Sequence, residues 1–228
     1  MSRFIALIPA AGVGERFGAG KPKQYVNIAG KTVLQHTLAV FLQHAEISQV
    51  VVVLSPNDTL FTNEAHEKLR VLRCGGATRA ESVRNGLNEL LAQNWAKETD
   101  GILVHDAARC CLPAEALSRL LHEAGQKAEG GILAIPVADT LKRMGASGQI
   151  DATVSRKDLW QAQTPQLFRA DLLQRALSVP DLSAITDEAS AVERLGIQPW
   201  LVLGDIRNLK LTLPHDEALV RVLLEGEK

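Results

Sequence analysis

The sequence predicts an α/β protein whose open, mostly parallel sheet carries helices on both faces. Short apolar runs that suit covered strands alternate with segments whose apolar residues recur at helical spacing. Several of these runs lead directly into loops that contain Gly or Pro. The pattern changes to alternation around residues 145–148, which predicts a β-hairpin over 137–154. We therefore expect a single domain over 1–228, with 137–154 as a protruding β-arm.

The first half of the chain repeats the order strand, helix, strand, which favours parallel pairing with right-handed crossovers. The expected strands are 4–8, 49–54, 71–73 and 101–105, and the expected helices start at Thr32, span 59–68 and start at Thr78. Thr32 and Thr78 are predicted N-caps, because a hydroxyl can accept the unpaired N–H groups of a first helical turn. Glu81 completes a capping box with Thr78.

The second half continues the same pattern around the arm. A helix is expected from Pro113 to about 123, a strand at 131–136, helices at 170–176 and from Thr186 to before 196, a strand at 200–203 and a last helix at 214–224. Thr186 is the predicted N-cap of its helix, and Asp187 and Glu188 lie in the first turn, where the helix dipole favours carboxylates. Adjacent residues point about 100° apart on a helix, so we do not expect these two to act as an acid–base pair.

The composition excludes several classes of protein. Lys and Arg total 25 against 26 Asp and Glu, for a net charge of -1, so no global charge attracts nucleic acid or a membrane surface. The three cysteines have no C-x-x-C spacing, which argues against a disulfide framework or a zinc site. There is no signal-like segment and no apolar stretch of about 20 residues. We expect a cytoplasmic protein.

The loop after the first strand is a candidate polyphosphate site. Residues 9–12 have small side chains, so a ligand can approach the backbone, and basic residues follow at Arg16, Lys21 and Lys23. The dinucleotide fingerprint G-x-G-x-x-G fails at Phe17, and the ATPase loop pattern fails as well. A nicotinamide-dependent dehydrogenase and a non-catalytic nucleotide-binding module remain as alternatives.

Two further segments are candidates for ligand contact. Gly75 and Gly76 precede the helix that starts at Thr78, and such a corner suits an anion or a base, although ordinary capping explains it equally well. Asp106 follows the strand 101–105, at the edge where open parallel sheets bind ligands. Its carboxylate can meet Mg²⁺ or a sugar hydroxyl, or can simply pair with Arg109.

The segment 9–16, followed by Pro22-Lys23-Gln24-Tyr25, resembles the signature of the cytidylyltransferases that act on 2-C-methyl-D-erythritol 4-phosphate in the non-mevalonate isoprenoid route. The segments 75–83 and 105–109 are also similar to that family, and the resemblance runs from Phe4 to about Leu224. Ala77 and Cys110 depart from the family pattern: some members have an acidic residue at the first position, and a proline is usual at the second.

The resemblance implies a Rossmann-like nucleotidyltransferase sheet that 164–168 re-enters after the arm. It implies transfer of a cytidylyl group from CTP to the polyol phosphate, with Mg²⁺ or another divalent cation as cofactor. It also implies a homodimer in which each arm completes the partner's site. A ribitol-5-phosphate cytidylyltransferase, or another sugar-phosphate nucleotidyltransferase, is the nearest alternative. A phosphate monoester has a second pKa of about 6, so the attacking oxygen of the acceptor is already mostly ionised at neutral pH and needs no general base. We therefore expect positively charged side chains around the phosphates to supply most of the catalysis.

The residues implied by this resemblance fall into three groups. Expected nucleotide contacts are Pro9, Ala10, Ala11, Gly12, Gly14, Gly76, Arg79, Ser82, Asp106 and Ala107. Expected catalytic cations are Arg16, Lys23, Arg156 and Lys210. Expected acceptor contacts are Asp106, Arg109, Thr140, Arg156, Thr164, Thr186 and Lys210, and Asp106 is the expected metal ligand.

Overall fold

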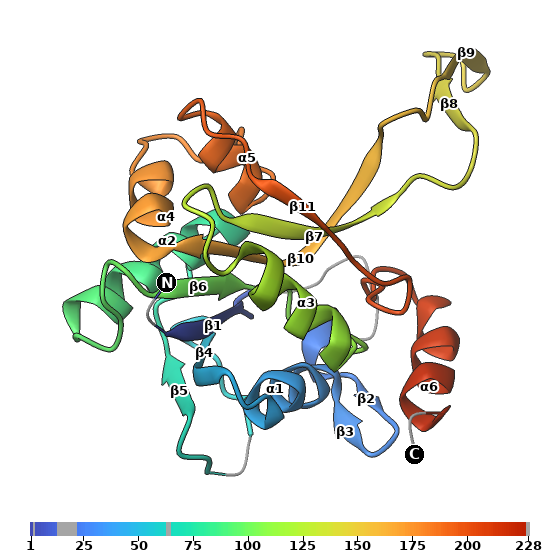
Figure 1. Cartoon of the computed structure of the whole chain (residues 1–228). Coiled ribbons are helices and arrows are strands. Elements are labelled where there is room, and N and C mark those ends of the chain that lie inside the picture. The colour runs from blue at the N-terminus through green and yellow to red at the C-terminus, as the bar shows by residue number, and fades with distance from the viewer. Residues whose placement is uncertain (2, 13–21, 63–64, 227–228) are drawn as a thin grey trace.

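The computed structural model of the protein describes residues 1, 3–12, 22–62 and 65–226. A seven-stranded sheet with the order β11-β7-β10-β6-β1-β4-β5 forms its centre (Figure 1). These strands are β1 (Phe4–Pro9), β4 (Ile47–Val53), β5 (Leu69–Leu72), β6 (Gly101–Val104), β7 (Gly131–Pro136), β10 (Trp160–Arg169) and β11 (Trp200–Leu203). β10 runs antiparallel to β6 and β7, and the other neighbours pair in parallel. The open, mostly parallel sheet is confirmed, including the return of 164–168 to it.

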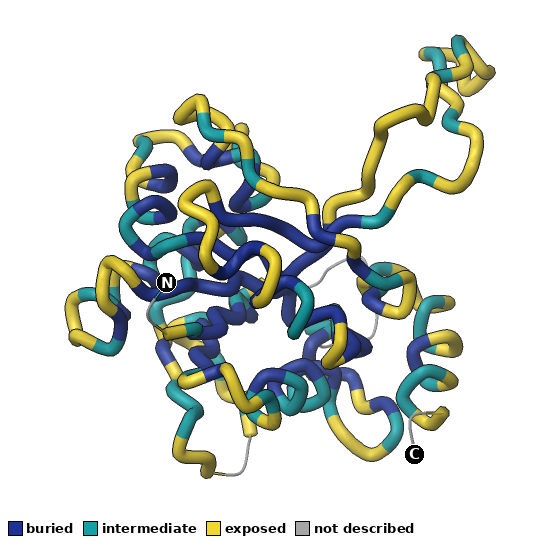
Figure 2. The backbone as a smooth tube through the Cα atoms, in the orientation of Figure 1, coloured by how far each residue is buried: buried dark blue, intermediate teal, exposed yellow. Residues whose placement is uncertain are grey.

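Helices cover both faces of this sheet, as predicted. They are α2 (Arg79–Ala92), α4 (Ala170–Leu177) and α5 (Glu188–Glu193) on one face and α1 (Val33–Gln43) and α3 (Ala114–Ala124) on the other. The last helix, α6 (Asp216–Gly226), packs outside the central sheet, against β2 (Asn27–Ile28). Because side chains alternate along a strand, Ile5 and Leu7 of β1 join a core cluster with α2, α4 and α5, while Ala6 and Ile8 join a cluster with α1 and α3. Figure 2 shows the central strands as the most continuously buried part of the chain.

Two of the three predicted N-caps are confirmed. Thr32 and Thr78 each accept the N–H of the third helical residue and complete a capping box, with Gln35 and Glu81 respectively. The third prediction was wrong by one residue, because Asp187 rather than Thr186 caps α5 and forms its box with Ser190. Aspartate is as good an N-cap as threonine or better, which explains the shift.

The helix predicted over 59–68 is also wrong. Residues 59–62 and 65–68 contain no helix. The Asp58 carboxylate accepts the N–H groups of Leu60 and Phe61 at 3.0 and 2.9 Å, which gives the backbone an alternative to helical bonds. The Tyr25 hydroxyl donates to the other oxygen of Asp58 at 2.5 Å and ties this turn to the loop that follows β1.

Three short elements that the sequence pattern did not predict lie between β1 and α1. They are a 3-10 turn η2 (Lys23–Tyr25) and a small antiparallel pair, β2 (Asn27–Ile28) and β3 (Lys31–Thr32). Ile28 packs in a third cluster with Leu211, with Val220 of α6 and with Cys110 and Cys111, whose sulfurs are 4.0 Å apart. This cluster brings the end of the chain beside the loop after β1.

The arm is a hairpin of β8 (Leu141–Met144) and β9 (Ile150–Val154), which confirms the prediction for 137–154. It projects from the body of the molecule between β7 and β10 (Figure 1) and is mostly exposed (Figure 2). Met144 and Ile150 are 76% and 67% exposed. Within the described ranges, no helix is both long and apolar enough to span a membrane.

Candidate active site

The site lies where the connections of the sheet change direction. β1 pairs with β4 on one side and with β6 on the other, so that Leu7 faces both Val51 and Val104. The chain leaves β1 toward β4 and β5 and later returns to add β6 on the opposite side. The loops after β1 and β6 therefore diverge at their carboxyl ends and open a crevice, which is the usual ligand position in such sheets.

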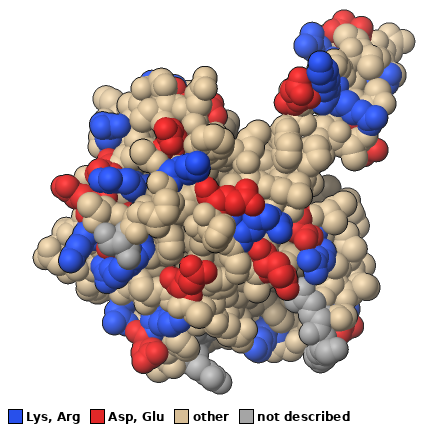
Figure 3. Space-filling view, viewed as in Figure 1, with Lys and Arg blue, Asp and Glu red and all other residues tan. Residues whose placement is uncertain are grey.

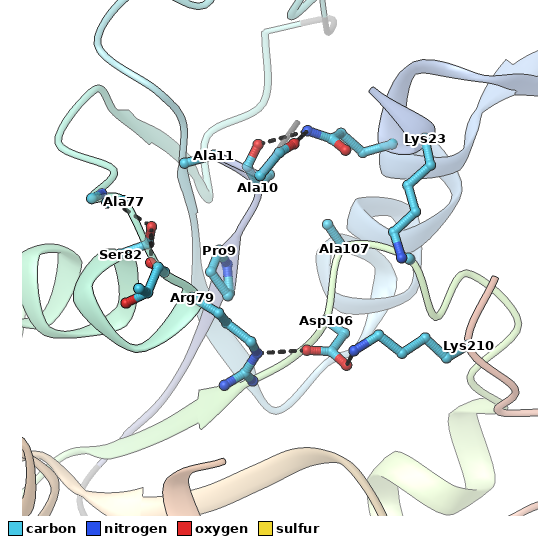
Figure 4. Close-up of a pocket in the computed structure, with 15 residues that line it drawn as sticks. Pro9, Ala10, Ala11, Lys23, Ala77, Arg79, Ser82, Asp106, Ala107 and Lys210 are labelled. Atoms are coloured by element: carbon cyan, nitrogen blue, oxygen red, sulfur yellow. Dashed lines mark hydrogen bonds and ion pairs between the residues drawn. The ribbon is translucent and has the colours of Figure 1, made fainter. Parts of the chain in front are cut away.

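A pocket of about 180 Å³ occupies this crevice (Figure 4). The predicted residues that line it are Pro9, Ala10, Ala11, Gly12, Lys23, Gly76, Arg79, Ser82, Asp106, Ala107 and Lys210. Its lining thus comes from segments up to 200 residues apart in sequence, and the structure brings nearly all the expected nucleotide contacts together. Gly14, an expected nucleotide contact, and Arg16, an expected catalytic cation, lie outside the described residues.

Gln24 is a lining residue to which the sequence analysis gave no role. Its side chain is 5% exposed, and its amide nitrogen donates to the carbonyl oxygens of Ala10 and Gly12 at 2.9 and 2.8 Å. Carbonyl oxygens repel a bound phosphate, so tying up two of them makes the loop a better anion site. The only signal in the sequence was the position of Gln24 inside the Pro22–Tyr25 motif.

The corner between β5 and α2 forms another wall of the pocket. Ser82 accepts the N–H of Gly76 at 3.1 Å and donates to the carbonyl of Thr78 at 2.9 Å, which sets the loop against the first turn of α2. Gly75 packs so closely that a Cβ added to it would stand 2.3 Å from the Cβ of Ala11. The glycine therefore allows this corner to contact the loop after β1 directly.

Asp106 is surrounded by three cations. Its Oδ1 pairs with Arg79 Nε at 2.7 Å, and its Oδ2 lies 2.8 Å from Lys210 Nζ and 3.6 Å from Arg109 Nε. Burial alone would raise the pKa of Asp106, but Arg79 and Lys210 outweigh burial and hold that pKa well below its usual range. The carboxylate is therefore ionised throughout the physiological pH range. The predicted pairing of Asp106 with Arg109 is the longest of the three.

Arg79 joins this cluster to α5. Its Nη1 and Nη2 donate to the two oxygens of Glu188 at 2.6 and 3.0 Å, while its Nε donates to Asp106. Asp187 instead accepts from Gln166 at 2.7 Å and caps α5. The two adjacent carboxylates thus point to different partners, and they do not form an acid–base pair. The prediction of a dipole role alone for Glu188 missed its ion pair.

His105 is linked to the residues of this cluster by hydrogen bonds. It is fully buried, its Nε2 donates to the carbonyl of Arg109 at 2.9 Å, and its Nδ1 lies 3.0 Å from the hydroxyl of Thr164. That hydroxyl accepts the backbone N–H of Asp106 at 3.0 Å, so it donates its own proton to His105. Burial lowers the pKa of His105 to about 4, which keeps the ring neutral. We assign it no chemistry.

A second pocket, of about 210 Å³, adjoins the first and shares Arg79, Asp106 and Lys210 with it. Arg109, Thr164 and Thr186, all expected acceptor contacts, also line this second pocket. The buried Nε of Arg109 has no hydrogen-bond partner in the described part of the chain. Burial lowers the pKa of Arg109, though the side chain remains a strong base.

Among the described residues, Thr140 and Arg156 are the two expected site residues that line neither pocket. Both are exposed, and neither lines the nucleotide-side or the adjoining pocket. Arg156 donates to the carbonyl of Ala138 at the base of the arm. In this structure neither side chain reaches the pockets of its own chain.

A group of three or more His, Cys, Asp and Glu side chains that could hold a metal does not occur among the described residues. Asp106 is the carboxylate that lines the first pocket. Within the described ranges, Asp106 is thus not part of a cluster of three or more such side chains.

The comparisons with known proteins agree with one another. The family model IspD, described as 2-C-methyl-D-erythritol 4-phosphate cytidylyltransferase, matches residues 4–226. A relative of that name from Neisseria meningitidis serogroup C is 64% identical over 224 residues, which cover 97% of each chain. Another from Laribacter hongkongensis is 52% identical over 227 residues, covering 98% of this chain and 97% of the relative.

Solved structures give the same result. A 4-diphosphocytidyl-2C-methyl-D-erythritol synthase superposes with a TM-score of 0.88 at 58% identity, over 98% of this chain and 99% of the other. The 2-C-methyl-D-erythritol 4-phosphate cytidylyltransferase of Francisella tularensis does so with a TM-score of 0.83 at 34% identity, over 97% and 100%. The chain therefore belongs to the IspD family of 2-C-methyl-D-erythritol 4-phosphate cytidylyltransferases.

Proposed function

We propose that this protein transfers the cytidylyl group of CTP to 2-C-methyl-D-erythritol 4-phosphate in the biosynthesis of isoprenoid precursors. A phosphate oxygen of the acceptor attacks the α-phosphorus of CTP, and the bond from that phosphorus to the bridging oxygen breaks. The products are 4-diphosphocytidyl-2-C-methyl-D-erythritol and pyrophosphate. The observation that carries this proposal, beside the family, is the pair of adjoining pockets that share Asp106, Arg79 and Lys210.

Two anionic substrates must meet in line for this reaction, so charge neutralisation and positioning supply most of the catalysis. We assign the first pocket to CTP, with the backbone of 9–12 and the Gly76 corner around the nucleotide and with Lys23 and Arg16 on its phosphates. The adjoining pocket takes the acceptor, with Arg109, Thr164 and Thr186 in its lining. Lys210 borders both pockets, which suits a cation that bridges the two reacting groups.

We propose Mg²⁺ as the cofactor. Asp106 offers an ionised carboxylate oxygen, the donor type that Mg²⁺ prefers, at the border of the two pockets. Both of its oxygens already face cations, so Asp106 would supply one ligand at most and the remainder would come from triphosphate oxygens and water. When bound, the metal ion would neutralise negative charge on the triphosphate.

We further propose that the protein is a homodimer in which the arm of each chain completes the pocket of its partner. The arm is exposed and carries apolar side chains at Met144 and Ile150. Thr140 on the arm and Arg156 just after it are the two expected acceptor residues that do not line the pockets of their own chain. Figure 3 shows basic and acidic side chains side by side at the end of the arm, so its surface there is polar and of mixed charge. The buried neighbouring thiols of Cys110 and Cys111 fit a reducing compartment, so we place the enzyme in the cytoplasm.

The experiment that tests the function measures pyrophosphate release from CTP and Mg²⁺ with three samples: 2-C-methyl-D-erythritol 4-phosphate, ribitol 5-phosphate, and no acceptor. We expect release with the methylerythritol phosphate alone. Release with ribitol phosphate alone would overturn the acceptor, and release with neither would overturn the reaction. Omitting Mg²⁺, with EDTA present, should abolish release if the cofactor is assigned correctly.

A further inference from the structure

Glu188 is a buried carboxylate that the proposed reaction does not use. Its side chain is 1% exposed, although a first-turn carboxylate gains from the helix dipole while remaining in solvent. Burying an ionised carboxylate is unfavourable unless charge and hydrogen bonds compensate. The burial of Glu188 therefore points to a specific partner, and that partner is Arg79.

The contact is a two-pronged ion pair. Both terminal nitrogens of Arg79 bond to Glu188, at 2.6 and 3.0 Å, and its Nε bonds to Asp106 at 2.7 Å. A guanidinium has five N–H donors, so three of the five are used by carboxylates that come from two different segments of the chain. Two carboxylates on two edges of one planar group hold its orientation as well as its position.

This orientation matters because of where the three groups stand. Arg79 and Asp106 line both pockets, whereas Glu188 lines neither. Figure 4 shows Arg79 and Lys210 on opposite sides of the Asp106 carboxylate, each linked to it. If Arg79 lost its hold on Glu188, its terminal nitrogens could turn onto Asp106 or onto a substrate phosphate, and the arrangement between the pockets would change.

We propose that Glu188 is a positioning residue for the cytidylyl transfer: it holds the Arg79 guanidinium so that Asp106 keeps its place between nucleotide and acceptor. This inference rests on the proposed function. Glu188 itself touches no substrate. Its effect should therefore appear in turnover more than in nucleotide affinity, and it should disappear when Arg79 is absent.

The test compares Glu188→Gln with the wild type and with Glu193→Gln, an exposed carboxylate at the other end of α5. Glutamine keeps the size of the side chain but removes its charge and one acceptor. We expect kcat to fall roughly 10- to 100-fold, as for other groups that orient a working side chain. KM for CTP should change less than about threefold, and Glu193→Gln should behave as the wild type.

A double-mutant cycle separates positioning from a general structural role. Arg79→Gln and the double variant Arg79→Gln/Glu188→Gln should have the same kcat/KM within about twofold, because Glu188 acts only through Arg79. If Glu188 merely stabilised α5, its loss would lower activity by the same factor in both backgrounds. That additive result, or an unchanged kcat in Glu188→Gln, would overturn the inference.

A readout independent of turnover is the NMR signal of the Arg79 terminal N–H groups. In the wild type these protons should be observable, because rotation of the guanidinium is hindered, and in Glu188→Gln they should broaden or vanish. Their persistence in the variant would overturn the claim that Glu188 holds Arg79. An inactive wild type with the expected NMR change would instead contradict the proposed reaction while leaving the hold on Arg79 established.

Discussion

Lys23 and Lys210 stand far apart in the sequence but meet at one pocket. Lys23 Nζ donates to the backbone carbonyl of Leu211 at 3.0 Å, directly next to Lys210, which pairs with Asp106 at 2.8 Å. The two ammonium groups thus lie along one side of the crevice, and the contact with Leu211 ties the loop after β1 to the segment before α6. At the scale of single residues, this pair carries much of the positive charge offered to the substrates.

Replacement of Lys23 by alanine should lower kcat by at least about a hundredfold. Loss of one charged contact to the transition state typically costs about 3 kcal/mol, and the fold should survive because Lys23 is half-buried at the edge of the pocket and belongs to no core cluster. Steady-state pyrophosphate release and a thermal melt measure the two effects. Lys97→Ala, an exposed lysine before β6, is the matched control and should keep full activity. Unchanged turnover in Lys23→Ala would remove that residue from the mechanism.

Several site residues could be predicted from sequence, and others could not, for identifiable reasons. Small residues beside cations in 9–12 and at Lys23 are visible as a phosphate-binding pattern. The role of Gln24 is hidden, because a neutral amide bonded to two backbone carbonyls leaves no pattern of charge or spacing. The pair of Glu188 with Arg79 joins residues 109 apart in sequence, and only the packing of α5 against the site brings them together.

At the scale of elements, the arm differs from the other strands because it does not pack against the body of its own chain. The hairpin β8–β9 pairs with itself, and most of its side chains are exposed. An isolated two-stranded hairpin is marginally stable in water, which is in keeping with the proposal that a second chain covers the arm. The body of the sheet does not need the arm, because β7 and β10 already pair with each other directly.

Replacing residues 141–154 by a short Gly-Ser linker should leave the fold of the body intact and abolish turnover. The expected loss comes from Thr140 and Arg156, whose position depends on the arm. Circular dichroism checks the fold, and light scattering should show a shift from dimer toward monomer.

Mixing supplies the decisive control for this deletion. The armless chain keeps Lys23, and a full-length Lys23→Ala chain keeps the arm, so a mixed dimer contains one complete site. Activity should therefore return on mixing two inactive proteins. If mixed dimers form and remain inactive, the arm does not act on the partner's pocket.

The prediction of elements was most successful where local chemistry decides the outcome. Apolar runs gave the strands of the sheet, and Thr-containing capping boxes gave the starts of α1 and α2. The prediction of a helix at 59–68 was wrong because the Asp58 carboxylate accepts two backbone N–H groups that a helix would use, and because the hydroxyl of Tyr25, from another loop, donates to the same carboxylate. The second of these contacts is a tertiary effect that no local pattern reveals. The pair β2–β3 was not predicted, because strands of two residues are too short to show an alternating pattern.

At the scale of the whole molecule, buried charge makes stability depend on pH. His105 is neutral in the folded protein, with its pKa lowered by burial to about 4, against about 6.5 when unfolded. Between these two pH values His105 is protonated in the unfolded state but not in the folded state. The free energy of unfolding is therefore not reduced by His105 above about pH 6.5, and it falls as the pH drops from there toward 4. His36 and His44, whose pKa values burial also lowers, act in the same direction. Asp106, with its depressed pKa, adds a further loss below about pH 4.

Urea unfolding should therefore give a free energy about 2 kcal/mol lower at pH 5 than at pH 7.5 from His105 alone, with the other groups adding to it. In His105→Gln that share should disappear, although the variant is less stable at both pH values because the bonds to Thr164 and Arg109 change. An equal pH dependence in variant and wild type would contradict a neutral buried His105.

The position of β10 also dictates an order of events while the chain is being made. β7 pairs only with β10 and β11 within the described sheet, and both are synthesised after it, with the whole arm in between. Until residue 169 has left the ribosome, the apolar strand 131–136 has no neighbour to complete its backbone hydrogen bonds. β1, β4, β5 and β6 form a contiguous block and can assemble earlier. A nascent chain halted within the arm would thus expose the unpaired, apolar edge of β7, which is prone to aggregate. We expect chaperones to bind the chain during this interval.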